Sequence, residues 1–318
     1  MFWRDKILKA IIETEGLTKV YLVDGREICA VDNLNLRVFE GDIFGYLGPN
    51  GAGKTTTILM LLGLTNPTSG SGRVAEYDIV RESKMIRSIA GYIPEKYGFY
   101  EDISAYRNLL YFARLNGIKD DEAKERIKWA LEVVELTDRA GSLVGTFSRG
   151  MKQRLALANA LIKRPKIIFL DEPTAGLDPY ATVNFRNLVI KLNKEYGMTI
   201  FLSSHMLHEV RQVCNRIGFL NNGKLVAVDT LQGFLNRIGN KIVVEVTNVS
   251  NEMIKAIEDI EGVDEIVKSD SEIIIYAKID VRLKIIDVVE GFGEKVLTIK
   301  IEQPTLEEVF FKVYGEGK

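Results

Sequence analysis

One stretch of sequence restricts the possible folds more than any other: Gly48–Thr55, which reads Gly-Pro-Asn-Gly-Ala-Gly-Lys-Thr. It fits the pattern G-x-x-x-x-G-K-[ST], follows an apolar run at Ile43–Leu47, and opens into a helical run at Lys54–Leu62 that stops at Gly63. This order of strand, loop and helix is the setting in which such a loop binds phosphate. Glycines let several backbone N–H groups converge on the phosphates, and the helix N-terminus adds its positive dipole end. The sequence therefore predicts an α/β protein with a nucleotide-binding P-loop.

Lys54 and Thr55 are the side chains of this loop with predicted chemical roles. Lys54 would reach the β- and γ-phosphates, and Thr55 would place its hydroxyl on Mg²⁺, which neutralises charge that develops during phosphoryl transfer to water. The plain alternative, a glycine-rich turn beside an ordinary helix, is disfavoured by the matched context. The predicted phosphate-binding set is Gly48, Pro49, Asn50, Gly51, Ala52, Gly53, Lys54, Thr55 and Thr56.

A second element ends in two adjacent acids, Asp171 and Glu172, after the apolar run Ile167–Leu170. Such a run predicts a buried strand that delivers both carboxylates at its C-terminal end. We expect Asp171 on the Mg²⁺ side, partly through water, and Glu172 as the general base that polarises the water attacking the γ-phosphorus. Alone, the pair would be read as a solvated turn. Together with the phosphate loop it predicts a nucleoside-triphosphate hydrolase.

The base of the nucleotide is predicted to be adenine. A guanine-specific site would need an Asn-Lys-x-Asp strand end, and the nearest string, Asn193-Lys194-Glu195-Tyr196, lacks the aspartate. The predicted cofactors are therefore ATP and Mg²⁺.

Composition argues against several other classes of protein. The 42 Lys and Arg residues are matched by 44 Asp and Glu residues without a large basic block, so we expect no nucleic-acid partner. Apolar runs such as Ile58–Leu64 fall far short of the roughly 18 to 20 residues that cross a bilayer. Met1–Lys6 mixes charges into the place where a signal peptide needs an apolar core, so we expect a cytoplasmic chain. Cys29 and Cys214 lack the spacing of a disulfide framework or a zinc site.

Hydrophobic periodicity predicts the order of elements in the first two-thirds of the chain. Short β-type runs such as Ile11–Thr14 and Leu34–Val38 come first, and helical spacing dominates between about Ile103 and Leu136. The strand-type runs Ile167–Leu170 and Thr199–Leu202 then alternate with helical segments, which favours a largely parallel, buried sheet.

The pattern changes after about Gly239. Strand-type and helical runs then follow in the order β-α-β-β-α-β, which predicts a ferredoxin-like (split βαβ) α+β domain with a short helix from Thr305. The runs are Lys241–Thr247, Asn251–Ile260, Val263–Val267, Glu272–Ala277, Ile279–Val289 and Lys295–Glu302. The expected domains are an N-terminal extension at 1–10, an ATPase domain at 11–235 with a helical subdomain at about 100–150, and a C-terminal accessory domain at 240–318.

Three further segments follow in an order that is typical of one family. Phe147–Arg154 reads Phe-Ser-Arg-Gly-Met-Lys-Gln-Arg, Asp171–Pro179 reads Asp-Glu-Pro-Thr-Ala-Gly-Leu-Asp-Pro, and Ser203-Ser204-His205 follows a predicted strand. They resemble the signature, the acidic strand with its D-loop, and the switch histidine of the ABC ATPase family. The resemblance covers roughly residues 11–235. It implies a P-loop NTPase core of the ABC type and a head-to-tail dimer, with ATP between the P-loop of one subunit and the signature of the other.

The resemblance implies roles for residues outside the P-loop. Ser148 and Gly150 stand at the start of a helical run, so a hydroxyl, backbone N–H groups and a helix dipole would face the partner's γ-phosphate. His205 would sense the γ-phosphate, Asp178 would link the two sites, and Tyr21 would stack on adenine. Taken singly, these residues would be read as a helix cap, a loop histidine, a turn aspartate and a strand tyrosine. The predicted catalytic set is Glu172, His205 and Lys54.

The chain departs from the family pattern at three positions. Arg149 and Met151 stand where the signature usually has Gly and Gln, and Glu95 stands at the usual Q-loop glutamine. Glu95 can still supply an oxygen to Mg²⁺ or water, although its charge would alter metal affinity. The predicted Mg²⁺ donors, partly through water, are Thr55, Asp171 and Glu95. Similar substitutions occur in ABC subunits of the drug, antibiotic and sodium exporter type, whose C-terminal extension also resembles the ending Gln303–Phe310 here.

The function implied by this resemblance is an ATP-binding and hydrolysing subunit that powers export through a separate membrane-spanning protein. Its expected partners are a second nucleotide-binding subunit and an integral membrane subunit, which would hold it at the cytoplasmic face of the membrane. The membrane subunit would dock near Glu95, Tyr97, Phe99 and Tyr100, although these aromatic residues fit a subdomain core equally well.

Two alternative functions stay open at this point. A soluble mechanical ABC ATPase usually carries two cassettes or a long coiled-coil insertion, which this sequence lacks. A weakly hydrolysing, nucleotide-dependent scaffold is suggested by Arg149 and Met151. The presence of Lys54, Asp171, Glu172 and His205 argues against it.

Overall fold

The structure is a computed structural model that describes residues 9–268, 272–302 and Glu308. It divides into two compact units, Met1–Val228 and Asp229–Lys318. This division lies a few residues before the boundary expected between 235 and 240, because α8 (Leu231–Ile238) belongs to the second unit. The helix expected from Thr305 and most of the expected N-terminal extension lie outside the described residues.

The main sheet of the first unit has the strand order β10-β9-β3-β8-β7-β6. Its strands are β3 (Ile43–Leu47), β6 (Ala90–Ile93), β7 (Ile167–Asp171), β8 (Thr199–Ser204), β9 (Arg216–Asn221) and β10 (Lys224–Thr230). β3 pairs in parallel with β8 and β9, and β7 pairs in parallel with β6 and β8. Every residue of β3, β7 and β8 is buried, as continuous apolar runs in a parallel sheet require. The prediction of a largely parallel, buried sheet is confirmed.

A second, antiparallel sheet has the order β2-β1-β4-β5. Its strands are β1 (Ala10–Val23), β2 (Arg26–Phe39), β4 (Ser69–Val74) and β5 (Tyr77–Asp78). β1 and β2 form a hairpin whose turn residues, Asp24 and Gly25, both have positive φ. An Asp-Gly pair is the usual solution for such a two-residue turn. The sequence pattern found only part of each strand, because turn residues and exposed side chains interrupt the apolar alternation.

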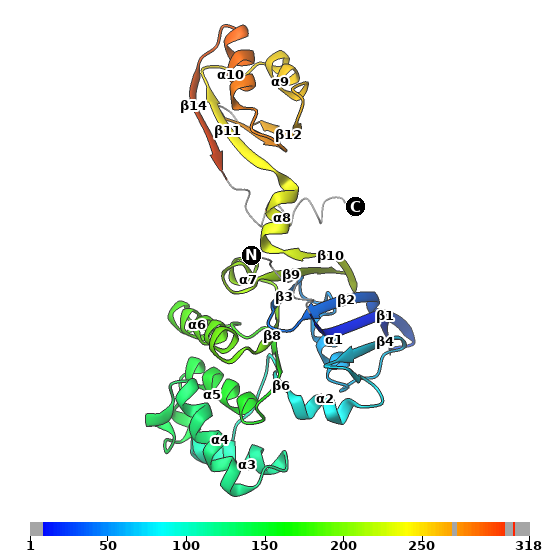
Figure 1. Ribbon diagram of the computed structural model, residues 1–318, viewed down its shortest axis with the longest axis vertical. Coiled ribbons are helices and arrows are strands. Elements are labelled where there is room, and N and C mark those ends of the chain that lie inside the picture. Colours follow the sequence, from blue (N-terminus) through cyan, green and yellow to red (C-terminus); the bar gives the residue numbers. More distant parts are fainter. Residues whose placement is uncertain (1–8, 269–271, 303–307, 309–318) are drawn as a thin grey trace, which may run out of the picture. The chain divides into compact units, whose positions relative to one another are not determined.

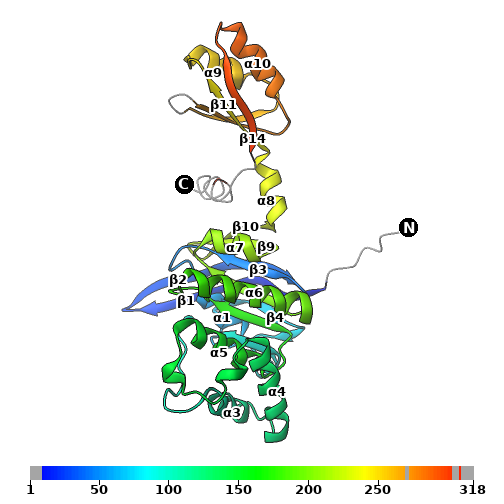
Figure 2. The same ribbon diagram turned by 90° about the vertical axis from the view of Figure 1, so that its left-hand side faces the viewer.

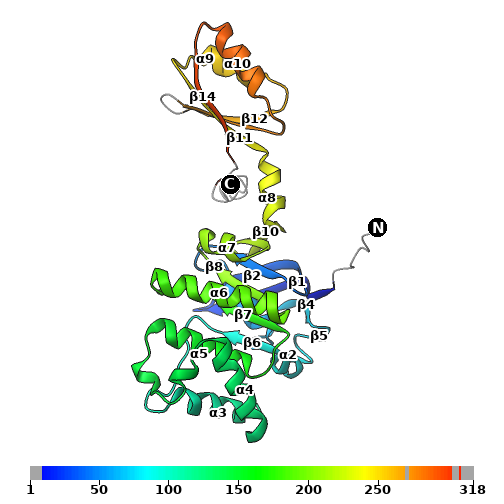
Figure 3. The same ribbon diagram turned by 60° about the vertical axis from the view of Figure 1, so that its left-hand side comes forward.

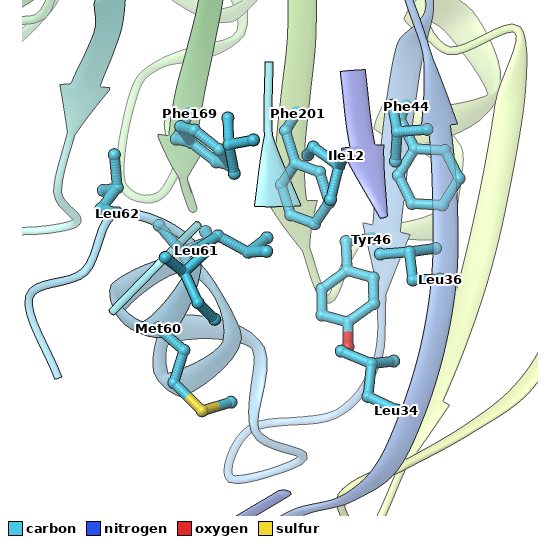
Figure 4. Packing of buried hydrophobic residues seen from close by; sticks show 14 of the residues in the cluster. Ile12, Leu34, Leu36, Phe44, Tyr46, Met60, Leu61, Leu62, Phe169 and Phe201 are labelled. Carbon is cyan, nitrogen blue, oxygen red and sulfur yellow. The ribbon is translucent and has the colours of Figure 1, made fainter. Parts of the chain in front are cut away.

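Aromatic side chains of the main, six-stranded sheet lie at the centre of the core. They pack between that sheet and helix α1 (Lys54–Leu61). The ring of Phe201 lies 5.5 Å from those of Phe44 and Phe169 and 5.2 Å from that of Tyr46. Figure 4 shows these rings with Leu61 of α1. The Tyr46 hydroxyl lies 3.2 Å from Thr57 Oγ1, which ties the start of α1 to β3.

The remaining helices of the first unit include a group that forms the expected helical insertion. α3, α4 and α5 lie together beside the sheets (Figure 2). α3 begins after Ser104, whose hydroxyl accepts a hydrogen bond from Arg107 N at 3.2 Å. The helices are α2 (Ser83–Ile89), α3 (Ala105–Leu115), α4 (Asp120–Val133), α5 (Arg149–Leu161), α6 (Pro179–Tyr196) and α7 (Leu207–Val213), with short 3₁₀ turns at Thr137–Arg139 and Val144–Thr146. Among the described residues, no helix has the length and apolarity to span a membrane.

The second unit has the predicted β-α-β-β-α-β order. After α8 come β11 (Asn240–Val246), α9 (Asn251–Glu258), β12 (Val263–Lys268), β13 (Glu272–Ala277), α10 (Arg282–Gly291) and β14 (Val296–Glu302). The sheet order β12-β13-β11-β14, with antiparallel neighbours, is that of a split βαβ fold. α9 and α10 cover one face of this sheet (Figures 1 and 3), where Ile257 and Ile285 pack on Val244 and Ile275.

Gly45 in β3 gives a test of the packing between the main sheet and α7. A Cβ at Gly45 would collide with Val210 Cγ1 and lie 3.0 Å from Cys214 Sγ. We expect Gly45→Ala to lower the free energy of unfolding by about 1–3 kcal/mol, measured by urea denaturation. Gly98→Ala is the matched control, because a Cβ there meets no heavy atom within 4 Å. Equal stability of the two variants would contradict this account of the packing.

Candidate nucleotide-binding and hydrolytic site

The P-loop joins β3 to α1 and is held from two sides. Gly51 and Gly53 have φ values of 80° and 103°, which side chains rarely adopt. A Cβ at Gly53 would also overlap the carbonyl oxygen of Ala30 in β2, and one at Gly48 would overlap that of Leu220 in β9. The glycines of the motif are therefore required by backbone conformation and by the close approach of two neighbouring strands.

The P-loop forms part of the wall of a cavity of about 340 Å³. Helix α1 begins after Gly53, and no side chain of a described residue caps it. Its first-turn N–H groups and its positive dipole end are thus available to an anion. The cavity is lined by Ala30, Asn50, Gly51, Gly53, Lys54, Thr55, Thr56, Glu95, Glu172, Ala175 and His205.

Lys54 is the buried cation of the site, with 6% of its side chain exposed. Its Nζ donates to the carbonyl oxygens of Gly48 at 2.8 Å and Pro49 at 3.1 Å. It also forms an ion pair with Glu172 Oε1 at 3.0 Å, and this oxygen accepts no hydrogen bond from a described residue. A buried ammonium with this acceptor set is fixed across the loop, where it can meet an anionic ligand.

Asp171 and Glu172 stand at the C-terminal end of β7, and both are held by Ser203 of β8. Ser203 Oγ donates to Asp171 Oδ1 at 2.6 Å and accepts from Glu172 N at 3.1 Å. Glu172 N also lies 3.2 Å from the Ser203 carbonyl oxygen. Glu172 has a φ of 48°, an unfavourable conformation for a non-glycine residue that turns its side chain out of the strand alternation.

The Glu172 carboxylate is flanked by two nitrogen-bearing side chains. Its Oε2 lies 2.9 Å from His205 Nδ1, and its Oε1 pairs with Lys54 as described above. Only 12% of the Glu172 side chain is exposed, whereas 43% of His205 is exposed. The carboxylate is therefore oriented from both sides and has limited contact with solvent, which suits a general base.

The carboxylates of Glu95 and Glu172, which line the cavity, and of Asp171 beside them fit a divalent cation. Burial raises the pKa of Asp171 above its usual range, the nearby carboxylates of Glu172 and Glu95 raise it further, and hydrogen bonds from Ser203 and Thr55 oppose this rise. A cation would relieve this repulsion between carboxylates. Among the described residues, no group of three or more His, Cys, Asp or Glu side chains is arranged to hold a metal by itself. Mg²⁺ matches such a partial donor set, because it normally combines one or two carboxylates with phosphate oxygens and water.

The other predicted site residues lie outside this cavity. Ser148 and Asp178 are the N-caps of α5 and α6, where Ser148 Oγ accepts from Met151 N at 3.2 Å and Asp178 Oδ1 accepts from Ala181 N at 2.8 Å. Gly150 follows in the first turn of α5. Tyr21 lies on β1, and its ring is covered by the Lys19 ammonium at 4.9 Å from the ring centroid. The cavity thus unites the P-loop, Glu95, Glu172 and His205 but not the signature, the D-loop aspartate or Tyr21.

Two lining residues, Ala30 and Ala175, were missed by the sequence analysis. The backbone carbonyl oxygen of Ala30 lies close to Gly53. An alanine in the sequence gives no indication of such a backbone contact. Ala175 lies within the segment that resembles the D-loop, so its position in the motif was the available signal.

Comparison with known proteins agrees with this geometry. Residues 31–175 match the family model described as ABC transporter. The chain is 37% identical over 310 residues to the bacitracin transport ATP-binding protein BcrA of Bacillus licheniformis, covering 98% of this chain and 99% of that one. It is 31% identical to the linearmycin resistance ATP-binding protein LnrL of Bacillus subtilis (strain 168), covering 96% and 98%. This chain belongs to the ATP-binding proteins of ABC transporters.

Solved structures of the family share the fold of the first unit. The ATP-binding cassette MJ0796, in a dimeric post-hydrolysis state bound to ADP and Pi, superposes with a TM-score of 0.62 at 28% identity, covering 69% of this chain and 98% of that one. The protein cbiO1 from Clostridium perfringens, part of the ABC transporter complex cbiONQ, gives a TM-score of 0.64 at 25% identity, covering 72% of this chain and 94% of that one. The predicted family and fold class are confirmed, and the protein is an ATP-hydrolysing subunit of an ABC transporter.

Ser203 provides a test of how this ABC subunit holds its acidic residues. Because Ser203→Ala removes the buried hydrogen bond to Asp171, we expect it to lower the free energy of unfolding by about 1–2 kcal/mol. We expect ATP turnover to fall by about tenfold or more, since Glu172 loses one of its two anchors. Ser88→Ala is the control, because Ser88 is exposed and its hydroxyl donates to the carbonyl oxygen of Met85, away from the acidic residues. Wild-type turnover in Ser203→Ala, measured by phosphate release, would contradict this role.

Proposed function

We propose that this ABC subunit pairs head to tail with a second nucleotide-binding subunit, that the pair closes on two molecules of Mg·ATP, and that their hydrolysis drives export by a separate membrane-spanning protein. The observation that carries this proposal is the arrangement of Lys54, Glu172 and His205 around the P-loop cavity. The relatives named for bacitracin transport and linearmycin resistance support an antibiotic as the cargo.

In the proposed hydrolytic step, Glu172 accepts a proton from the water that attacks the γ-phosphorus. Mg²⁺, held by Thr55, Asp171 and Glu95 partly through water, would supply charge neutralisation at the phosphates. Lys54 adds a fixed positive charge on the same side, and His205 holds the Glu172 carboxylate at 2.9 Å. Since these groups are oriented before the reaction, little rearrangement of the protein is needed at the moment of transfer.

The proposed dimer explains why the signature residues lie outside the cavity. Ser148 and Gly150 begin α5, whose N-terminal N–H groups and dipole would act on the nucleotide of the partner subunit. Asp178, at the start of α6, would contact the partner across the same interface. The dimeric state of the related cassette MJ0796 supports this arrangement. Each complete site would then combine the P-loop of one subunit with the signature of the other.

The surface proposed for the membrane partner is a chain of aromatic rings that runs from the Q-loop onto α3. Tyr97 contacts Phe99, which contacts Phe112, and Tyr111 contacts both Phe112 and Tyr100 at 5.2–5.5 Å. Tyr100 and Tyr111 are 54% and 40% exposed, so this surface can bury aromatic area against a partner. Docking there would hold the subunit at the cytoplasmic face of the membrane.

The backbone under this surface is fixed by Asn108. Its buried side chain accepts from Tyr100 N and donates to the Tyr100 carbonyl oxygen, both at 2.9 Å. A rigid backbone reduces the conformational entropy lost on binding. This bidentate clamp therefore favours a contact surface over an ordinary solvent-exposed loop.

Replacement of Glu172 by Gln tests the proposed base and the dimer together. We expect Glu172→Gln to lower ATP turnover by at least about 100-fold, because a general base contributes on that order. We also expect it to accumulate as an ATP-loaded dimer in light-scattering measurements at several protein concentrations. Glu132→Gln, on the exposed face of α4, serves as the control. An undiminished rate would rule out Glu172 as the base, and a monomer at all concentrations with ATP would argue against the dimer.

Replacement of Tyr100 tests the membrane-docking surface. We expect Tyr100→Ala to reduce the amount of subunit that co-purifies with its membrane partner by about tenfold, as loss of a central aromatic contact does elsewhere. The measurement compares membrane fractions from cells that express both proteins. Tyr196→Ala is the control, because this 40% exposed tyrosine lies at the far end of α6. Unchanged assembly in Tyr100→Ala, with the fold intact, would exclude this surface.

A further inference from the structure

Arg149 occupies a signature position where the ABC family usually has glycine, and the structure gives its side chain a specific partner. It is the first residue of α5, directly after the N-cap Ser148. Its Nη2 donates to the carbonyl oxygen of Ala175, at a distance of 2.6 Å, in the D-loop of the same chain. The signature and the D-loop of one subunit are therefore joined by a charged hydrogen bond that a glycine cannot make.

The D-loop is shaped to receive this guanidinium. A Cβ at Gly176 would lie only 2.5 Å from Arg149 Cζ and 2.6 Å from Nη2, and the φ of Gly176 is +69°. A side chain at position 176 would thus displace the guanidinium and strain the backbone. Next to this contact, a Cβ at Gly150 would lie 2.8 Å from Ala181 Cβ, so the starts of α5 and α6 are closely packed.

The bonded carbonyl lies in the middle of the turn that carries Glu172. Ala175 N donates to the Glu172 carbonyl oxygen at 3.1 Å, and Leu177 N donates to that of Thr174 at 3.1 Å. The turn ends at Asp178, which caps α6. Arg149 therefore bonds a short segment, residues 172–178, that is held together by its own hydrogen bonds. The proposed base Glu172 is at one end of this segment and Asp178 is at the other.

We propose that Arg149 is a positioning residue that acts in cis, joining the signature to residues 172–178 so that they move as one piece. This inference rests on the proposed head-to-tail dimer, in which the signature of one subunit meets the nucleotide of its partner. Engagement of that nucleotide would then orient Glu172 in the subunit's own site. The rival role, an arginine that reaches the partner's phosphate in trans, would require the guanidinium to leave Ala175 and Gly176.

Amide hydrogen exchange tests the cis contact without any dimer. In the nucleotide-free full-length chain, we expect Arg149→Ala to speed exchange in a peptide covering 172–178 by about three- to tenfold, the effect of losing one hydrogen bond of this kind. Arg149→Lys, which keeps one donor, should fall between the wild type and Arg149→Ala. Arg107→Ala, an exposed arginine in the first turn of α3, is the matched control. Wild-type exchange in Arg149→Ala would overturn the proposal.

Mixed dimers then separate action in cis from action in trans. One subunit carries Arg149→Ala and the other Glu172→Gln, and the reference is a dimer of wild type with Glu172→Gln. The one site that keeps Glu172 then takes its signature from the subunit with intact Arg149. If Arg149 acts in cis, turnover stays below the reference by the same factor, about three- to tenfold, that separates the Arg149→Ala homodimer from wild type. Turnover equal to the reference would establish action in trans and overturn the proposal.

The outcomes distinguish failure of the proposed function from failure of the positioning role. If ATP does not assemble the wild type into dimers, the proposed function fails while the exchange experiment still decides whether Arg149 holds the D-loop. If the dimer forms and Glu172→Gln behaves as expected, but exchange at 172–178 is unaffected by Arg149→Ala, the positioning role alone is wrong.

Discussion

The site depends most on the two hydrogen bonds that the Ser203 hydroxyl makes. It lies at the end of β8, one of the two middle strands of the main sheet, and bonds both the carboxylate of Asp171 and the amide of Glu172 at the end of β7. On the other side of β8, Gly48 N donates to the Ser204 carbonyl oxygen at 3.2 Å, which fixes the start of the P-loop. The phosphate-binding and acidic elements are far apart in sequence. Their separation in space is set by hydrogen bonds to two consecutive residues of one strand.

The aromatic core makes this arrangement rigid. Side chains two apart on a strand share a face of the sheet, so Phe201 and Ser203 point the same way, as do Phe169 and Asp171. The rings of Phe169 and Phe201 are 5.5 Å apart, directly behind the pair that Ser203 and Asp171 form. The strands that hold these packed rings therefore also hold the polar residues of the site. A shift in the ring layer would move the carboxylate that is expected to face Mg²⁺.

Much of this could be predicted from sequence because the motifs are local. Gly48–Thr55 specifies its own turn, and the apolar run before Asp171 specifies a buried strand. The split βαβ unit was also predictable, since each of its strands and helices has a clear period and β13 and β11 pair in simple register. The long β1–β2 hairpin was predicted only in part, because the half next to its turn is exposed or half-buried and shows no regular apolar alternation.

Contacts between distant segments were beyond the reach of the sequence. The overlap of Ala30 with Gly53 and the bond from Ser203 to Asp171 depend on strand order and register, which single residues do not encode. The same holds for Arg149. From sequence it was a departure from the signature that suggested weak hydrolysis, whereas the structure gives it a partner in Ala175.

The two departures that carry charge, Glu95 and Arg149, have different physical consequences. Burial raises the pKa of Asp171, and the carboxylates of Glu172 and Glu95 raise it further, so a bound cation would relieve the repulsion that Glu95 adds. Arg149 lies against the D-loop turn, where its charge is used in a hydrogen bond to a carbonyl. Neither replaces a group of the hydrolytic centre, because Lys54, Glu172 and His205 keep their mutual contacts without them. We therefore expect the two departures to act on metal affinity and on the connection between the signature and the D-loop, and not on the chemistry of hydrolysis.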